Sequence, residues 1–129
     1  AEWEYAARAG SQTAWPFGDD EKMLGEYAWY GEASSKPHPV GTKRPNAWGL
    51  HDMIGNVWEW VADWYTSSYP SEAQADPTGP MLGEYHVMRG GSLVHPSRIL
   101  RSANRFRVQP SIRIEIIGFR CVRSLRPQP

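Results

Sequence analysis

Residues 55–65, GNVWEWVADWY, hold three of the chain's seven tryptophans. From position 57 to position 62, Val, Glu and Val alternate with Trp, Trp and Ala. A period of two predicts a short strand, because successive side chains of a strand point to opposite faces. Tryptophan buries a large apolar area, so we expect most of Trp58, Trp60 and Trp64 to lie in the core. The stretch therefore predicts a strand at the centre of the fold.

The segments on either side predict short elements around this strand. AEWEYAARAG (1–10) has helical spacing, with Gly10 as a natural C-cap. HVMRGGS (86–92) begins as a strand and turns at Gly90-Gly91, and IEIIGFRCVRS (114–124) is typical of a strand kinked at its glycine. RSANRFRV (101–108) is ambiguous, GEYAWYGEASSKPHPVGTKRPNAWGL (25–50) has the pattern of short extended pieces broken by Gly and Pro, and LRPQP (125–129) is expected to be a tail.

Composition places the chain in a class. Its 129 residues suit one domain, and 11 Pro with 12 Gly predict many turns and few long helices. One short helix, several short strands and much irregular loop indicate an α+β fold. No apolar run reaches the length that a bilayer requires, so direct membrane insertion is not expected. No secretory signal is visible at the start, and compartment and oligomeric state stay open.

Charge and cysteine content narrow the function classes. Residues 1–80 carry a balance of −7 and residues 81–129 a balance of +7, the latter from nine Arg and two Glu. Arginine without lysine suits fixed bidentate pairing within the fold better than loose phosphate contacts, so nucleic-acid binding is not predicted. Cys121 is the only cysteine. We expect it to be a small buried residue and not a nucleophile. The four histidines lack metal-ligand spacing.

Five motifs point together to one family. EWEYAARAG, PNAWGLHDMIGNVWEWVADWY, RGGS, RSANRFR and IGFRCVR occur in that order and span almost the whole chain. They resemble the formylglycine-generating-enzyme (sulfatase-modifying factor) family. The resemblance implies an α+β, C-type-lectin-like fold of short strands, little helix and much irregular loop. It also implies a single domain over 1–129 that lacks the family's N-terminal segment.

The family's enzymes use a copper-binding pair of cysteines after RGGS. The corresponding positions in this chain are about His95 and Leu100. That chemistry needs thiolates, which neither residue supplies. We therefore predict no enzyme activity and no required cofactor. The alternative is a sulfatase-modifying-factor-like enzyme, or a structural domain that has lost those cysteines.

A second branch of the resemblance accounts for residues 93–116, whose sequence as a whole follows no helix or strand period. Variable proteins diversified by retroelements share this fold and keep a fixed frame, here Arg89–Ser92, Arg101–Arg105, Arg107, Pro110, Arg113 and Ile117–Arg120. Randomised adenines in asparagine-type codons produce most of the residues found in between. The resemblance thus implies a variable surface that binds a protein target, made of Leu93, Val94, His95, Pro96, Arg98, Ile99, Phe106, Val108, Gln109, Ser111, Ile112, Ile114, Glu115 and Ile116.

Two questions stay open at this stage, the exposure of apolar residues within 93–116 and a calcium site. Ile112, Ile114 and Ile116 share a period of two, which fits either an exposed patch or the inner face of a strand; the resemblance favours exposure for the first two. Phe106 is either an interface anchor or a core residue.

A calcium site is the second open question. Asp52, Gly55, Val57 and Glu59 match calcium-binding positions of the enzyme branch, where side-chain and backbone oxygens act as ligands. In the alternative, Glu59 accepts hydrogen bonds from a loop backbone and no metal is needed.

Overall fold

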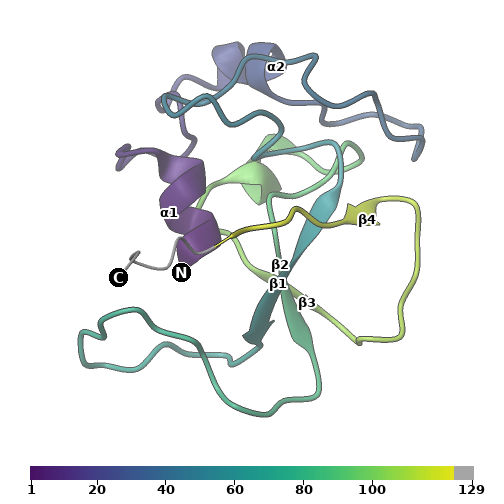
Figure 1. Cartoon of the computed structure of the whole chain (residues 1–129). Coiled ribbons are helices and arrows are strands. Elements are labelled where there is room, and N and C mark those ends of the chain that lie inside the picture. The colour runs from purple at the N-terminus through teal and green to yellow at the C-terminus, as the bar shows by residue number, and fades with distance from the viewer. Residues whose placement is uncertain (124–129) are drawn as a thin grey trace.

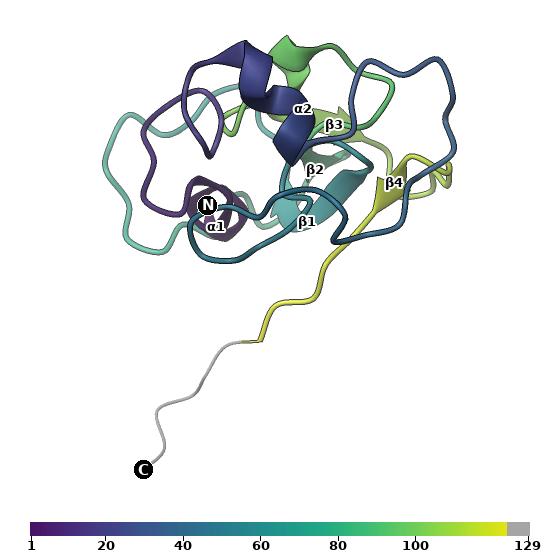
Figure 2. The same cartoon turned by 90° about the horizontal axis from the view of Figure 1, so that it is seen from above.

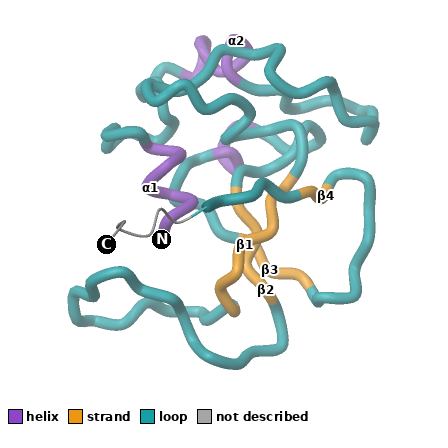
Figure 3. Tube along the Cα trace, in the orientation of Figure 1, coloured by secondary structure: helices purple, strands orange, loops and turns teal. Residues whose placement is uncertain are grey.

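The computed structural model describes residues 1–123. Short helices and a small curled sheet are connected by long loops, as Figures 1 and 3 show. This arrangement confirms the expected α+β class. In chain order the elements are α1 (Glu2–Arg8), the 3-10 turn η1 (Glu21–Met23), α2 (Leu24–Tyr27), β1 (Trp58–Trp64), β2 (His86–Arg89), the 3-10 turn η2 (Ser97–Leu100), β3 (Phe106–Val108) and β4 (Ile117–Gly118).

The four strands form one mixed sheet in the order β3-β2-β1-β4. β2 is antiparallel to both β1 and β3, whereas β4 is parallel to β1. Met88 pairs with Trp60 on one side and with Phe106 on the other, so these three residues share a face, which we call the Trp60 face. Glu59 pairs with Arg89 on the opposite face, the Glu59 face, against which α1 packs.

Two clusters of buried side chains form the core. One contains Trp15, Leu24, Ala28, Ile54 and Leu100, and the other contains Trp3, Ala7 and Met53. The second cluster lies between α1 and the sheet. Seen from above in Figure 2, α1 lies beside β1, whereas Figure 1 shows α2 at the opposite end of the molecule from the long connection between β1 and β2.

The central tryptophans only partly match the prediction. Trp58 is buried, but Trp60 and Trp64 are only half-buried. The core is instead completed by Trp3 and Trp15, which come from the N-terminal third of the chain.

Several predicted elements are confirmed, with shifted ends. The strand expected over 57–62 spans Trp58–Trp64, and the strand before Gly90-Gly91 is β2. The predicted helix is α1, but its left-handed C-cap is Ala9, at φ 46°, and not Gly10.

Two stretches differ from expectation. Leu24–Tyr27 forms a single helical turn, which follows η1 and its cap, the Asp20 side chain that accepts a hydrogen bond from the backbone N–H of Lys22. The strand predicted over 114–124 shrinks to Ile117–Gly118, because the chain turns at 110–111 and again at 115–116. Residue 124 and the expected tail at 125–129 lie outside the described residues. No helix within 1–123 is long and apolar enough to span a membrane.

Candidate binding face

The glycine turn after β2 brings the backbone against η2. Gly90 and Gly91 have φ of 91° and 75°, a region that side-chain-bearing residues rarely adopt. A Cβ added to Gly91 would lie 2.8 Å from Cδ1 of Leu100, which is fully buried. This close approach fixes the path of the chain as it enters the stretch 93–116.

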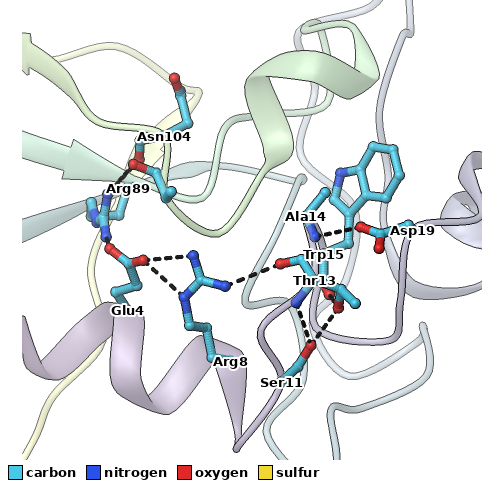
Figure 4. A network of polar contacts seen from close by, with 10 residues as sticks. Glu4, Arg8, Ser11, Thr13, Ala14, Trp15, Asp19, Arg89 and Asn104 are labelled. Atoms are coloured by element: carbon cyan, nitrogen blue, oxygen red, sulfur yellow. Dashed lines mark hydrogen bonds and ion pairs between the residues drawn. The ribbon is translucent and has the colours of Figure 1, made fainter.

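A buried arginine ties this region to α1. Arg89 donates to the carbonyls of Ala103 (3.1 Å) and Asn104 (2.6 Å) and also pairs with the Glu4 carboxylate. Glu4 pairs in addition with Arg8, at 2.8 Å. Figure 4 shows this network joining α1, β2 and the segment before β3. Because Arg89 is buried and satisfied, it holds the segment 101–105 in place.

The network continues beyond α1 into the loop that follows it. Arg8 donates to the carbonyl of Thr13 at 3.0 Å, and the Asp19 carboxylate accepts from the backbone N–H of Ala14 at 2.7 Å. Ser102, which is fully buried, donates its backbone N–H to the carbonyl of Ala14 at 2.9 Å. The segment 101–105 is thus hydrogen-bonded both to the side chain of Arg89 and to the loop that follows α1.

A second arginine occupies the surroundings of the predicted calcium ligands. The buried Glu59 carboxylate accepts from Nε of Arg120 (2.9 and 2.8 Å), from a terminal nitrogen of Arg120 (2.6 Å) and from Nε1 of Trp3 (2.6 Å). Arg120 also donates to the backbone carbonyl of Asp52 at 3.1 Å, and the Asp52 carboxylate accepts from the N–H of Gly41 at 2.7 Å.

These contacts do not fit a calcium site. Both acidic side chains of the predicted set already have partners, and the charge of Glu59 is balanced by a guanidinium. The structure favours the alternative in which Glu59 is satisfied by hydrogen bonds, although the donors are side chains and not a loop backbone. Replacing Arg120 by a hydrated cation would cost an ion pair whose carboxylate is buried.

Calcium should therefore leave the stability unchanged. Millimolar calcium added to chelator-treated protein is expected to produce no shift of the melting temperature beyond that produced by magnesium at the same ionic strength. Ligands that bind only the folded state raise the melting temperature by mass action, so a calcium-specific rise would contradict this reading.

Trp58 connects the two ends of the predicted variable surface. Its ring is buried, with the ring of His95 at 5.3 Å in an edge contact and the ring of Phe106 at 5.7 Å in a stacked contact. The backbone N–H of Trp58 donates to the carbonyl of Ile116 at 2.8 Å. His95 and Ile116, which are 21 positions apart, thus both contact Trp58 of β1, one through its ring and the other through its backbone.

An open cleft of about 340 Å³ lies next to this convergence, on the Trp60 face. Its walls come from the loop between β3 and β4, which Figure 1 shows extending beyond the edge of the sheet. The lining residues are Trp60, Ile112, Arg113, Ile114, Glu115 and Ile117. Ile114 is 54% exposed and Phe106 is 56% exposed, so large apolar side chains face solvent here.

The structure distributes the fourteen predicted surface residues over three environments. Eight are exposed: Pro96, Arg98, Phe106, Gln109, Ser111, Ile112, Ile114 and Glu115. Five are half-buried: Val94, His95, Ile99, Val108 and Ile116. The isoleucine question is thereby answered in favour of exposure for Ile112 and Ile114, and these residues lie in a loop and not in a strand.

Leu93 is a correction. Its side chain is 0% exposed, its N–H donates to the carbonyl of Asn56, and its carbonyl accepts from the N–H of Glu32. Directly after the glycine turn the chain still runs through the interior, so Leu93 cannot belong to a binding surface. Ile99 packs against the core cluster that contains Leu100 and is only partly available.

Sequence reasoning missed Trp60 and Ile117, which line the cleft but were assigned to the core or to the fixed frame. The period-two alternation of β1 was the available signal for Trp60. It places Trp60 on the same face as Trp58, where Trp60 is half-buried and Trp58 is buried.

The two positions that match the family's cysteines offer little chemistry. His95 accepts or donates a hydrogen bond at Nδ1 with the hydroxyl of Ser92 (2.7 Å), and burial lowers the pKa of His95, so the ring is neutral at neutral pH. Leu100 is fully buried. Cys121 is exposed, contrary to prediction, because the chain leaves the sheet after Gly118.

Comparisons with known proteins agree with this architecture. Residues 1–125 match the sulfatase-modifying factor enzyme 1-like domain. The formylglycine-generating enzyme of Streptomyces coelicolor is 40% identical over 147 residues, which cover 94% of this chain and 44% of that protein.

Two solved structures are also similar. Treponema denticola variable protein 1 superposes with a TM-score of 0.85 at 38% identity, covering 92% of this chain and 43% of that one. PvdO from Pseudomonas aeruginosa gives a TM-score of 0.77 at 39% identity, covering 92% and 48%. The chain spans less than half the length of each of these relatives.

Proposed function

The chain belongs to the family of sulfatase-modifying factor enzyme 1-like domains, and on this basis we propose that it is a non-catalytic member that binds a protein target through a variable surface. The observation that carries the proposal is the grouping of exposed apolar side chains around the cleft on the Trp60 face. Exposed apolar patches next to a cleft are typical of interaction sites. Similarity to a protein named as a variable protein supports the same assignment.

The binding surface consists of the exposed and half-buried residues of the predicted set together with Trp60 and Ile117. Leu93 is left out of it. The surface rests on backbone held by Arg89, by the glycine turn and by Trp58. Such a frame allows exposed side chains to change without unfolding the domain. Affinity would come from a few apolar anchors, of which Phe106 and Ile114 are the most exposed.

The enzyme alternative lacks its nucleophiles in this chain. Thiol chemistry of the family's kind requires a cysteine pair, and the 129 residues contain Cys121 alone. Cys121 follows the short strand β4 and does not stand at either of the two positions after RGGS that match the family's cysteines. Leu100, at one of those positions, is buried in the core.

The alternative of a purely structural domain predicts no exposed apolar patch over 93–116. Ile112, Ile114 and Phe106 are exposed, the first two in the loop between β3 and β4 and the third in the strand β3. Burying such residues in a partner gains free energy, whereas leaving them in water does not. This observation favours a binding surface.

Sequencing the DNA that flanks the gene tests the variable surface directly. We expect a near-copy of the stretch encoding residues 89–123, differing only at adenines, together with a gene for a reverse transcriptase. Differences should fall in codons for exposed residues such as Phe106 and Ile114, and spare those for Arg89 and Gly91. A genome without such a copy would leave residues 93–116 as ordinary diverged loop and remove the claim of diversification.

A further inference from the structure

A second cluster lies on the other side of β3, outside the cleft. Because side chains alternate along a strand, Arg107 points to the face opposite Phe106. Arg107 and its neighbour Arg105 contact three tyrosines, which belong to the long connection between β1 and β2. Figures 1 and 3 show this connection at the end of the sheet away from α2.

Rings and guanidinium groups alternate in this cluster. Cζ of Arg105 lies 4.0 Å from the ring centroid of Tyr69 and 5.3 Å from that of Tyr65. Cζ of Arg107 lies 5.2 Å from the centroids of both Tyr65 and Tyr85. We call these five residues the Arg–Tyr ladder. Four cation–π contacts in one place exceed what two isolated surface arginines would make.

The two positive charges of the ladder have no acidic partner. Within residues 1–123, the ion pairs of Glu and Asp side chains involve the N-terminus, Arg8, His38, Arg44, Arg89 and Arg120. Neither Arg105 nor Arg107 is among these partners. Ring contacts use the faces of a guanidinium, and its N–H donors, which lie in the plane, stay available for a carboxylate.

The hydroxyl of Tyr85 already has a partner. A hydrogen bond to the Glu84 carboxylate and its charge raise the pKa of Tyr85, an effect that Arg107 partly opposes. The two arginines, of which Arg107 is exposed and Arg105 half-buried, are therefore the groups of the ladder that remain for a carboxylate.

We propose that the Arg–Tyr ladder is a docking surface for an acidic segment of a partner protein. Within residues 1–123 no ion pair balances the charges of Arg105 and Arg107, so the ladder carries a local positive charge that attracts carboxylates. Each guanidinium presents its own set of in-plane donors, which suits separate carboxylates along a peptide. Single-stranded nucleic acid fits less well, because bases need free ring faces and the arginines already cover faces of Tyr65, Tyr69 and Tyr85.

The ladder and the cleft would also have different roles in binding a partner. Arg105 and Arg107 fall at positions that the family resemblance marks as fixed, whereas the cleft walls vary. A constant electrostatic contact would then accompany a changing apolar one. This division rests on the proposed function, but binding of an acidic segment to the ladder does not.

A short all-glutamate peptide carrying a fluorescent label is the probe. Its affinity for the wild-type domain is measured by anisotropy at low ionic strength and compared with that of Arg105→Gln/Arg107→Gln. Loss of two charge-assisted contacts should weaken binding about tenfold or more. The control is Arg98→Gln/Arg101→Gln, which removes the same charge from two exposed arginines away from the ladder. It should weaken binding much less.

Three results would overturn the proposal. The first is that the wild type does not bind the peptide. The second is that both double variants weaken binding equally. The third is that single-stranded oligothymidylate binds the ladder better than the peptide does. If the ladder variant does not fold, Arg107→Gln alone replaces it, because that side chain is exposed. Phe106→Ala should leave peptide binding unchanged, so that failure of the ladder and failure of the cleft give different results.

Discussion

Gly91→Val should lower the free energy of unfolding by about 3–5 kcal/mol, because a left-handed backbone and a steric clash act together. Gly91 has φ of 75°, which a β-branched residue tolerates badly. Its new Cβ would stand 2.8 Å from Cδ1 and 3.1 Å from Cγ of Leu100, and 3.4 Å from the carbonyl oxygen of Ile99. Leu100 is fully buried in the core, so a shift of its side chain would disturb the packing around it. Denaturation by urea, followed by tryptophan fluorescence, measures the loss.

The matched control for this substitution is Ile114→Thr. Ile114 lies on the cleft wall and is largely exposed, so its replacement should cost less than about 0.5 kcal/mol. The contrast tests the division into a fixed frame and a variable surface. Equal losses for the two variants, or an unaffected Gly91→Val, would show that no such division exists.

The sequence predicted the parts of the fold that depend on local patterns. The alternation in residues 57–62 predicted β1, and the helical spacing of EWEYAARAG predicted α1. Gly90-Gly91 predicted the turn, because a positive φ favours glycine at this point of the chain. Each of these signals involves residues close together in the sequence, so each could be recognised without knowledge of the tertiary structure.

The remaining features depend on residues that are far apart in the sequence. Arg120 and Glu59 are 61 positions apart, and nothing in the local pattern around either residue shows that they form an ion pair. Without that pair, Glu59 looked like a metal ligand. The single turn of α2 was missed because four residues are too few to display a helical period.

The candidate site shows the same limit. Leu93 matched a variable position by sequence, yet the carbonyl of Asn56 draws its backbone into the interior. The alternation of Ile112, Ile114 and Ile116 suggested a strand, but turns on both sides leave the segment as a loop. Exposure of Ile112 and Ile114 was nevertheless expected from the family resemblance, because it rests on which positions vary in the family and not on the sequence period. The contribution of Trp60 to the cleft could be recognised only when β4 and its preceding loop were placed beside β1.

Phe106→Ala combined with Ile114→Ala should weaken binding of the protein partner about 100-fold, since truncating two central apolar anchors typically costs a few kcal/mol. Phe106 is held in place by its stacked contact with the buried ring of Trp58, so little conformational entropy is lost when a partner covers it. Ile114 lines the cleft on the same face of the sheet, and burial of both side chains removes apolar surface from water. The partner is first isolated on immobilised wild-type domain and identified by mass spectrometry, and affinities are then measured by calorimetry with purified components.

The control Val40→Ala separates this surface from general apolar adhesion. Val40 is 80% exposed but lies outside residues 93–116, so its truncation should leave the affinity unchanged. Melting temperatures of both variants confirm that each remains folded. If the Phe106/Ile114 variant binds as tightly as the wild type, the partner contacts another part of the domain and the proposed binding face is wrong. If Val40→Ala weakens binding equally, the captured protein adheres to any exposed apolar residue and is not a specific target. A loss confined to the Phe106/Ile114 variant places the partner on the Trp60 face, because Phe106 belongs to that face and Ile114 lines its cleft.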